Sequence, residues 1–422
     1  MRFATLQDWL AWQETLHPSE IELGLERVAA VAQRMALLPA PFIVITVGGT
    51  NGKGSTVAML EAILLTAGYR VGAYTSPHLL RYNERVRVNG AAVEDAQLCD
   101  AFERVDQARA TTSLTYFEFG TLAAVDIFRR QGVDVAILEV GMGGRLDAVN
   151  VFEPDAAIVT TVDLDHAQWL GDTREAVGYE KAGIYRSGRP AVFGSTDIPQ
   201  SVLDHADRID VPLRRFGCDF GYTAEGRLWR WWAGGGPQHN NLPLPALRGR
   251  SQLQNAAGVL MVLELLAARL PVAEEHIRSG LQAVQLPGRF QLVAGEVPLI
   301  LDVAHNPQAA AELSSNLDAL PTDGRTLAVL GMLADKDMSQ VAAILARRID
   351  RWFLATLPAA RGAGAGQLAD ALQAVGVPAE RLTTFDSVAG ALAKARRDAK
   401  AGDRIVVFGS FFTVAEALAA PV

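Results

Sequence analysis

Apolar runs and helical patterns alternate along most of the chain. Three apolar runs have the length and composition of buried parallel strands: Phe42–Val47, Val133–Leu138 and Ala156–Thr161. After the first run, apolar residues return at helical spacing, and Gly68 follows as a signal that ends a helix. Because strands and helices that alternate in this way build a parallel sheet covered by helices, we predict an α/β fold.

A second alternation begins after the break at Leu286–Phe290. It predicts strands at Pro298–Val303, Thr326–Leu330, Trp352–Ala355 and Arg404–Gly409, with helices between them. We therefore predict two domains, residues 1–288 and residues 289–422, the second being a smaller Rossmann-like domain. Residues 3–38 are expected to be helical, and residues 186–250 to alternate short strands with polar turns.

Composition narrows the class of protein. Hydrophobic residues make up 50% of the chain and charged residues 20%, which is typical of a globular chain. The net charge of −8 offers no bulk attraction to nucleic acid, and no apolar run is long enough to span a membrane. Cys99 and Cys218 lie far apart, the N-terminus has no signal-peptide pattern, and no long apolar surface stripe stands out. We expect a cytoplasmic monomer without structural zinc.

The first strand leads through a glycine-rich turn into a helix, the context that a phosphate-binding loop requires. Glycines let backbone N–H groups approach anionic oxygens, and the helix N-terminus adds partial positive charge. Lys53 is placed to reach a β- or γ-phosphate, and Ser55 or Thr56 to offer a hydroxyl to phosphate or Mg²⁺. Gly54 separates the lysine from the hydroxyl residues, which departs from the usual pattern. The combination still predicts a nucleoside triphosphate site.

Polar residues follow the ends of the neighbouring strands. Ser76 lies in the turn after a short strand, Glu139 ends the strand Val133–Leu138, and His166 follows the next one. Because the carboxyl ends of parallel strands meet at one edge of a sheet, these residues are expected near Lys53. A buried Glu139 needs a partner, either a lysine or, as we favour, Mg²⁺. Ser76 is equally compatible with a simple turn, and His166 with a structural role or a metal ligand.

Three further features of the sequence can each be interpreted in two ways. Lys181 is most simply a salt-bridge partner, yet a cation there would be unfavourable beside Mg²⁺. Arg81, Arg85 and Arg87 could face an anionic substrate or belong to a solvated charged strand. The aromatic segment Thr115–Phe119 could stack on a flat heterocycle or pack in the core.

Over nearly its whole length, the chain resembles the dihydrofolate synthase/folylpolyglutamate synthase family of the Mur ligase superfamily. Six motifs carry this resemblance and together are highly specific: Gly49–Ser55, Thr75–Leu79, Leu138–Asp147, Leu164–His166, Glu180–Ile184 and Asp302–Pro307. The glycine at position 54 is this family's own form of the phosphate loop. The resemblance implies a P-loop-containing, Mur-ligase-like ATP-binding domain followed by a Rossmann-like glutamate-ligase domain.

The resemblance also implies roles for single residues, which fall into ATP contacts and metal ligands. The ATP contacts would be Thr50, Asn51, Gly52, Lys53, Gly54 and Ser55 at the phosphates, Asn255 near adenine, Arg289 at a phosphate, and Asp302 at the ribose or another part of the nucleotide. Ser76, Glu139 and His166 look like ligands of Mg²⁺, with two Mg²⁺ sites in all. Lys181 matches the lysine that this family carboxylates with CO₂, and a carbamate there would be an anion able to support the second Mg²⁺.

Further segments resemble those that hold dihydropteroate in bifunctional bacterial members of the family. They are Thr115, Tyr116, Phe117 and Glu118, then Leu146, Asp147 and Ala148, with Leu23 and Gly24 expected at the same ligand. Val149 stands where the family often has threonine, which bears only on the detail of the pterin site.

The implied reaction is an ATP-dependent ligation through an acyl phosphate, with Lys53, Glu139, His166 and Lys181 as the catalytic set. The substrates would be dihydropteroate or reduced folates together with L-glutamate. Three alternatives stay open: only one of the two synthase activities, another Mur-type amide ligase, or a non-catalytic ATP-binding regulator.

Overall fold

The computed structural model describes residues 2–19, 21–164, 167–359 and 361–420, and the chain divides into two compact units. The first unit comprises Met1–Ala246 and Gln252–Val284, and the second comprises Leu247–Ser251 and Gln285–Val422. The two units divide at Val284, close to the domain boundary that the sequence predicts after residue 288. Whether each domain folds independently with that boundary stays a prediction. No helix in the described ranges combines the length and the apolar character that a membrane crossing needs.

The first unit is built on a sheet to which the described residues contribute eight strands, in the order β4-β3-β2-β5-β1-β6-β7-β8. All neighbours pair in parallel except β2 with β3 and β3 with β4. Its strands are β1 Ile43–Gly48, β2 Val71–Tyr74, β3 Val86–Val88, β4 Ala91–Ala92, β5 Val135–Glu139, β6 Ala156–Val159, β7 Ala191–Phe193 and β8 Leu213–Arg215. The register places Val47 beside Glu139 on one side and beside Ile158 on the other. The ends of β1, β5 and β6 therefore lie at one edge.

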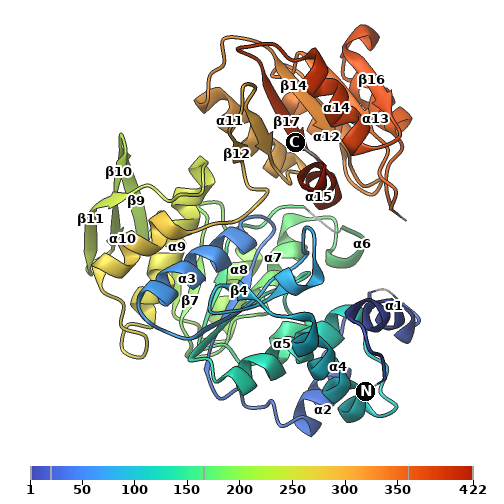
Figure 1. Cartoon of the computed structure of the whole chain (residues 1–422). Helices are drawn as coiled ribbons and strands as arrows, with labels where there is room; N and C mark the ends of the chain where they lie inside the picture. The colour runs from blue at the N-terminus through green and yellow to red at the C-terminus, as the bar shows by residue number, and fades with distance from the viewer. Residues whose placement is uncertain (1, 20, 165–166, 360, 421–422) are drawn as a thin grey trace. The chain divides into compact units, whose positions relative to one another are not determined.

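Helices cover both faces of this sheet (Figure 1). They are α1 Leu6–Leu16, α2 Glu26–Arg34, α3 Lys53–Thr66, α4 Asp95–Arg109, α5 Tyr116–Gln131, α6 Ala167–Leu170, α7 Arg174–Ala182, α8 Gln200–Arg208, α9 Arg250–Leu265 and α10 Glu274–Ala283, with the 3₁₀ turns η1 Tyr82–Arg85 and η2 Ala148–Val151. Val44 of β1 and Leu138 of β5 belong to one buried cluster with Phe119 and Leu122 of α5. The helix α5 begins with a capping box, since the Thr115 hydroxyl accepts from the Glu118 N–H while the Glu118 carboxylate accepts from the Thr115 N–H.

A small antiparallel sheet of β9 Phe220–Glu225, β10 Leu228–Ala233 and β11 Gln238–Pro243 completes the first unit. It confirms the hairpin expected around Trp231 and Trp232. Trp231 is fully buried and its indole N–H donates to the Ala257 carbonyl of α9, which attaches this sheet to the helix. The expectation of only short strands and turns over residues 186–250 is wrong for α8, which buries Val202 and Ala206 on one face.

The second unit contains a six-stranded sheet within the described residues, ordered β12-β13-β17-β14-β15-β16. Only β12 runs antiparallel to its neighbour. Its elements are β12 Gln291–Val293, β13 Leu299–Leu301, α11 Pro307–Ala319, β14 Thr326–Leu330, α12 Met338–Leu345, β15 Arg351–Ala355, α13 Ala365–Ala374, η3 Ala379–Arg381, β16 Leu382–Phe385, α14 Val388–Asp398, β17 Arg404–Phe408 and α15 Phe411–Ala419. The predicted α/β fold, with a second Rossmann-like sheet, is confirmed.

Candidate active site

The loop between β1 and α3 is held against the end of β6. The Thr50 N–H donates to the Thr161 carbonyl at 2.8 Å, and the Asn51 N–H donates to the Thr161 hydroxyl at 3.1 Å. The Thr160 hydroxyl donates to the Asn51 carbonyl at 2.6 Å. Gly49 has a φ of 139°, and a Cβ there would lie 1.9 Å from the Thr160 hydroxyl oxygen, so only glycine fits. The loop is thus fixed in shape by its neighbours in the sheet.

Lys53 begins α3 and folds back over this loop. Its ammonium group donates to the carbonyl oxygens of Gly49 at 2.9 Å and Thr50 at 3.2 Å. At Gly52, with a φ of 89°, a Cβ would lie 2.7 Å from the Asn255 side-chain oxygen. The structure therefore brings Asn255 against the phosphate loop itself, and its expected place near adenine stays a prediction.

Ser76 and Glu139 meet at the ends of β2 and β5, as the strand-end rule predicts. The Ser76 N–H donates to a Glu139 carboxylate oxygen at 3.2 Å, and Glu139 is buried. A hydroxyl and a carboxylate are hard oxygen ligands of the kind Mg²⁺ prefers, so the two residues fit a divalent cation. His166 lies outside the described residues. Among the residues that are described, no group of three or more His, Cys, Asp or Glu side chains is arranged to hold a metal.

Lys181 lies buried near the end of α7. The glycine turn that follows Glu139 packs directly on this part of the helix: a Cβ at Gly144 would lie 3.0 Å from the Lys181 carbonyl oxygen. The next residue, Arg145, donates its backbone N–H to the Glu180 carbonyl at 2.8 Å and its guanidinium to the Glu180 carboxylate. The backbone of Lys181 is therefore packed against the turn that follows Glu139.

Asp147 is a buried acid in the segment expected to hold the pterin. Burial raises the pKa of its carboxyl to about 6, against the hydrogen bonds from the Met142 and Val149 N–H groups and the positive charge of Lys53. Asp147 follows the turn after β5, and β5 pairs with β1, which leads into the phosphate loop. This segment therefore leaves the sheet at the same edge as the phosphate loop.

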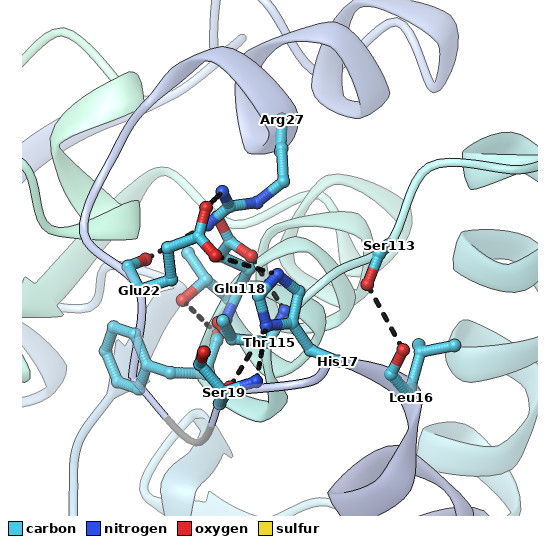
Figure 2. A network of polar contacts seen from close by, with 10 residues as sticks. Leu16, His17, Ser19, Glu22, Arg27, Ser113, Thr115 and Glu118 are labelled. Atoms are coloured by element: carbon cyan, nitrogen blue, oxygen red, sulfur yellow. Dashed lines mark hydrogen bonds and ion pairs between the residues drawn. The ribbon is translucent and has the colours of Figure 1, made fainter.

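The three segments expected at the pterin come together. The Gly24 N–H donates to the Leu146 carbonyl at 3.3 Å, which joins the Leu23–Gly24 and Leu146–Ala148 segments. The Phe117 ring packs on the turn after Glu139, where a Cβ at Gly141 would lie 2.7 Å from it. Figure 2 shows Glu118 and Thr115 at the start of α5 beside Arg27 and Glu22.

The three arginines after Ser76 have different partners. Arg81 pairs with Asp95 at 2.9 Å and Arg87 with Glu61 at 2.7 Å. Arg85 donates through Nε to the His78 Nδ1 at 2.9 Å, and its guanidinium lies over the rings of Tyr82 and Tyr116 at 5.3 and 5.6 Å. Burial and the Arg85 charge lower the pKa of His78 to about 4, so this histidine is a neutral acceptor at neutral pH. Within the described chain, no ion pair joins Arg85 to a carboxylate.

Arg289 and Asp302 lie together in the second unit. Asp302 accepts from the Phe290 and Ala304 N–H groups, each at 2.8 Å. Burial raises the pKa of Asp302 to about 6, against the opposing charge of Arg289. The Arg289 guanidinium lies 5.0 Å from the centre of the Phe411 ring. The contacts of Asp302 and Arg289 with a nucleotide stay predictions.

Two family models match the chain: the Mur ligase middle domain over residues 47–219 and the Mur ligase, glutamate ligase domain over residues 288–411. The dihydrofolate synthase/folylpolyglutamate synthase of Escherichia coli is 47% identical over 98% of this chain and 94% of that protein. The chain belongs to the dihydrofolate synthase/folylpolyglutamate synthase family. The resemblance predicted from the motifs is confirmed.

Solved structures of this family have the same fold. The complex of E. coli FolC with DHPP and ADP matches with a TM-score of 0.93 and 46% identity, over 99% of this chain and 97% of that one. A bifunctional folylpolyglutamate synthase/dihydrofolate synthase with Mn, AMPPNP and L-glutamate bound matches with a TM-score of 0.91 and 47% identity, over 99% and 98% of the two chains.

Sequence reasoning gave no role to Arg27, included His78 only as part of the Thr75–Leu79 motif, and did not choose among the three arginines. A signal for Arg85 existed, since it lies in the polar stretch after the Ser76 turn. Arg27 gives no such signal, because its contact Glu118 lies 91 residues away.

Proposed function

We propose that the chain joins L-glutamate to dihydropteroate, and further L-glutamate to reduced folates, with ATP hydrolysed to ADP and phosphate. A carboxylate oxygen of the acceptor attacks the γ-phosphorus of ATP and ADP leaves, giving an acyl phosphate. The amine of L-glutamate then attacks the acyl carbon and phosphate leaves. The names of the relatives, dihydrofolate synthase/folylpolyglutamate synthase, and the matching glutamate ligase domain support this ligase activity.

One observation supports the pteroate substrate most directly. The segments that contain Gly24, Leu146 and Phe117 gather around the turn after β5, at the sheet edge where the neighbouring strand β1 leads into the phosphate loop. An acceptor carboxylate has to approach the γ-phosphate for phosphoryl transfer, so an acceptor site must adjoin the phosphate loop. Arg85, which lies near two tyrosine rings and has no carboxylate partner in the described chain, suits the anionic end of such an acceptor.

In this proposal, the residues at the sheet edge hold ATP and Mg²⁺. Thr50, Asn51, Gly52, Lys53, Gly54 and Ser55 would contact the phosphates. Asn255 would lie near adenine, Arg289 at a phosphate, and Asp302 at the ribose or another part of the nucleotide. Ser76, Glu139 and His166 would hold Mg²⁺, and carboxylated Lys181 would support a second Mg²⁺. When bound, Mg²⁺ would supply positive charge to offset that of the transferring phosphoryl group, and Lys53 would orient the γ-phosphate. We propose in addition that the protein acts as a cytoplasmic monomer without nucleic-acid or membrane partners.

Phosphate release tests the function. Purified protein receives ATP, Mg²⁺ and L-glutamate together with dihydropteroate, with a reduced monoglutamyl folate, or with neither. The proposal expects release with each acceptor and none without one. Release with a single acceptor would restrict the function to that activity. No release with either, from a folded protein that binds ATP, would exclude both and favour another Mur-type acceptor.

A further inference from the structure

A chain of charges links the loop before α2 to the first turn of α5 (Figure 2). Arg27, in the first turn of α2, forms an ion pair through Nη1 with the Glu22 carboxylate. Its Nη2 donates to the Glu22 carbonyl at 3.0 Å and to the Glu118 carboxylate at 3.1 Å. The His17 Nε2 lies 3.4 Å from the other oxygen of Glu22. One guanidinium thus contacts two carboxylates from segments that are far apart in the sequence.

The Glu118 end of this chain is the more buried one. The Glu118 side chain is 4% exposed and that of Arg27 is 23% exposed. The second oxygen of Glu118 accepts from the Thr115 N–H at 2.7 Å, so the same carboxylate caps α5. A carboxylate so buried needs a cation close by, and Arg27 supplies it. The planar guanidinium of Arg27 can donate to two acceptors in fixed directions, which the ammonium group of a lysine does less well.

Both ends of the chain belong to segments that the proposed function places at the pterin. Leu23 and Gly24 directly follow Glu22, and Thr115–Glu118 is the start of α5. The loop is half-buried and its Gly24 N–H makes a long hydrogen bond of 3.3 Å to Leu146. If such a loop is already fixed before the ligand binds, less conformational entropy is lost on binding, and the affinity is higher.

We propose that Arg27 is a positioning residue of the pterin site, which fixes the loop of residues 22–25 against the first turn of α5. The inference rests on the proposed function, because it assumes that these segments hold dihydropteroate. Arg27 acts through the two segments and does not itself touch the reacting atoms.

A purely structural role makes a different prediction, so the test separates stability from binding. Arg27→Met removes the cation and both contacts, whereas Arg27→Lys keeps a charge beside Glu118 but loses the fork that also holds Glu22. The control is Arg104→Met. Arg104 pairs with the buried Asp126 at 2.6 Å and is 28% exposed, and Asp126 keeps its ion pairs with Arg129 and Arg130. Among the described residues, no hydrogen bond or ion pair joins Arg104 to the pterin segments.

The measurements are the Tm and the Kd for dihydropteroate in the presence of Mg²⁺ and ADP, by calorimetry on the full chain, with KM values for ATP and L-glutamate. Arg27→Met should raise the Kd for dihydropteroate roughly tenfold and leave the KM values for ATP and L-glutamate within about twofold. Arg27→Lys should recover most of the Tm while its Kd stays raised several-fold. Arg104→Met should lower the Tm alone.

The remaining outcomes contradict either the role of Arg27 or the proposed function. If the Kd follows the Tm through all three variants, or stays at the wild-type value in Arg27→Met, Arg27 is structural and the inference is wrong. A wild-type chain that binds dihydropteroate without ligating it would overturn the proposed function, while the Kd values still decide the role of Arg27. A wild-type chain that does not bind dihydropteroate overturns both.

Discussion

The ammonium group of Lys53 is bound to carbonyl oxygens of its own loop, within reach of the helix N-terminus where phosphates bind. These neutral acceptors are weaker partners than phosphate oxygens, so the lysine can turn to a nucleotide at little cost. Lys53→Ala should therefore lower kcat for phosphate release by about a thousandfold or more, since the removed charge acts on the transferring phosphoryl group. Steady-state phosphate release measures this, with circular dichroism to confirm folding. Retention of substantial ligation would remove the assignment of the phosphate loop.

Lys181 is buried, and its carbonyl packs against the glycine turn after Glu139. The proposed function places Mg²⁺ at this position, which an unmodified cation would oppose. If a carbamate stands there, Lys181→Ala should lose about a hundredfold or more in rate. Formate or acetate should then restore part of the activity by supplying the missing carboxylate. The measurement is ligation rate against acid concentration, and Lys53→Ala serves as the variant that the acids should not rescue. Equal responses in the two variants would argue against the carbamate.

Asp147 has a consequence for stability against pH. Its folded carboxyl keeps its proton up to about pH 6, while an unfolded aspartate, with the ordinary pKa of 3.8, loses it earlier. The folded state therefore binds more protons between these values, and stability falls as the pH rises through this window. The full effect is roughly 3 kcal/mol, and Asp147→Asn should abolish it. We expect the Tm of the variant to rise relative to that of the wild type as the pH increases from 4 to 7, both measured without ligands. A Tm difference that stays constant with pH would contradict the raised pKa of Asp147.

Single residues differ in how far the sequence reveals them. Ser76 and Glu139 were predicted to meet, because each follows a parallel strand and the ends of such strands share an edge. Arg27 could not be predicted, since its ion pair with Glu118 depends on how α2 packs on α5. The position of Asn255 against Gly52 likewise depends on the packing of α9, which no local pattern specifies.

At the scale of elements, the turn after β5 is packed tightly on the helix α7, because Gly144 lies close to backbone carbonyl oxygens of that helix. Gly144→Ala would place a Cβ 2.9 Å from the Glu180 carbonyl oxygen and 3.0 Å from that of Lys181. The two elements must then separate, at a cost of about 1–3 kcal/mol, and the backbone of Lys181 moves with them. Thermal unfolding and ligation rate should both fall.

The control for this change is Gly366→Ala in α13, where an added Cβ meets nothing within 4 Å. Because alanine favours a helix over glycine, this variant should be unchanged or more stable by up to about 1 kcal/mol. Equal destabilisation by both substitutions would contradict the close packing of the turn on α7.

Elements whose large apolar residues differ clearly from their polar neighbours were predicted well. Elements whose buried faces consist largely of small residues such as alanine were not. The strand β14 was predicted at Thr326–Leu330, the bounds that the structure has. The helix α14 buries Val388, Ala391, Leu392 and Ala395, and alanine contrasts too little with its neighbours to mark a helical face. The helix α8 was missed because its apolar positions are scattered among charged ones over nine residues.

At the scale of the whole molecule, each unit has its own sheet and its own buried core. The core of the second unit includes Ile300, Ala328, Leu330 and Val406 from neighbouring strands and is closed by α11 to α13. A part of the chain with a complete core of this size can fold alone. The phosphate loop, by contrast, belongs wholly to the first unit.

These two facts together predict how a fragment of residues 285–422 behaves. Its single tryptophan, Trp352, is 1% exposed, so the folded fragment should emit at short wavelength and shift to the red in one cooperative transition on heating. Because the fragment lacks the phosphate loop, ADP with Mg²⁺ should leave its Tm unchanged. The same ligand at a hundred times its Kd should stabilise the first unit of the full chain by about 2.7 kcal/mol. A fragment that melts without cooperativity would mean that the second sheet needs the first unit to fold, and a Tm raised by ADP would place a nucleotide site in the second unit alone.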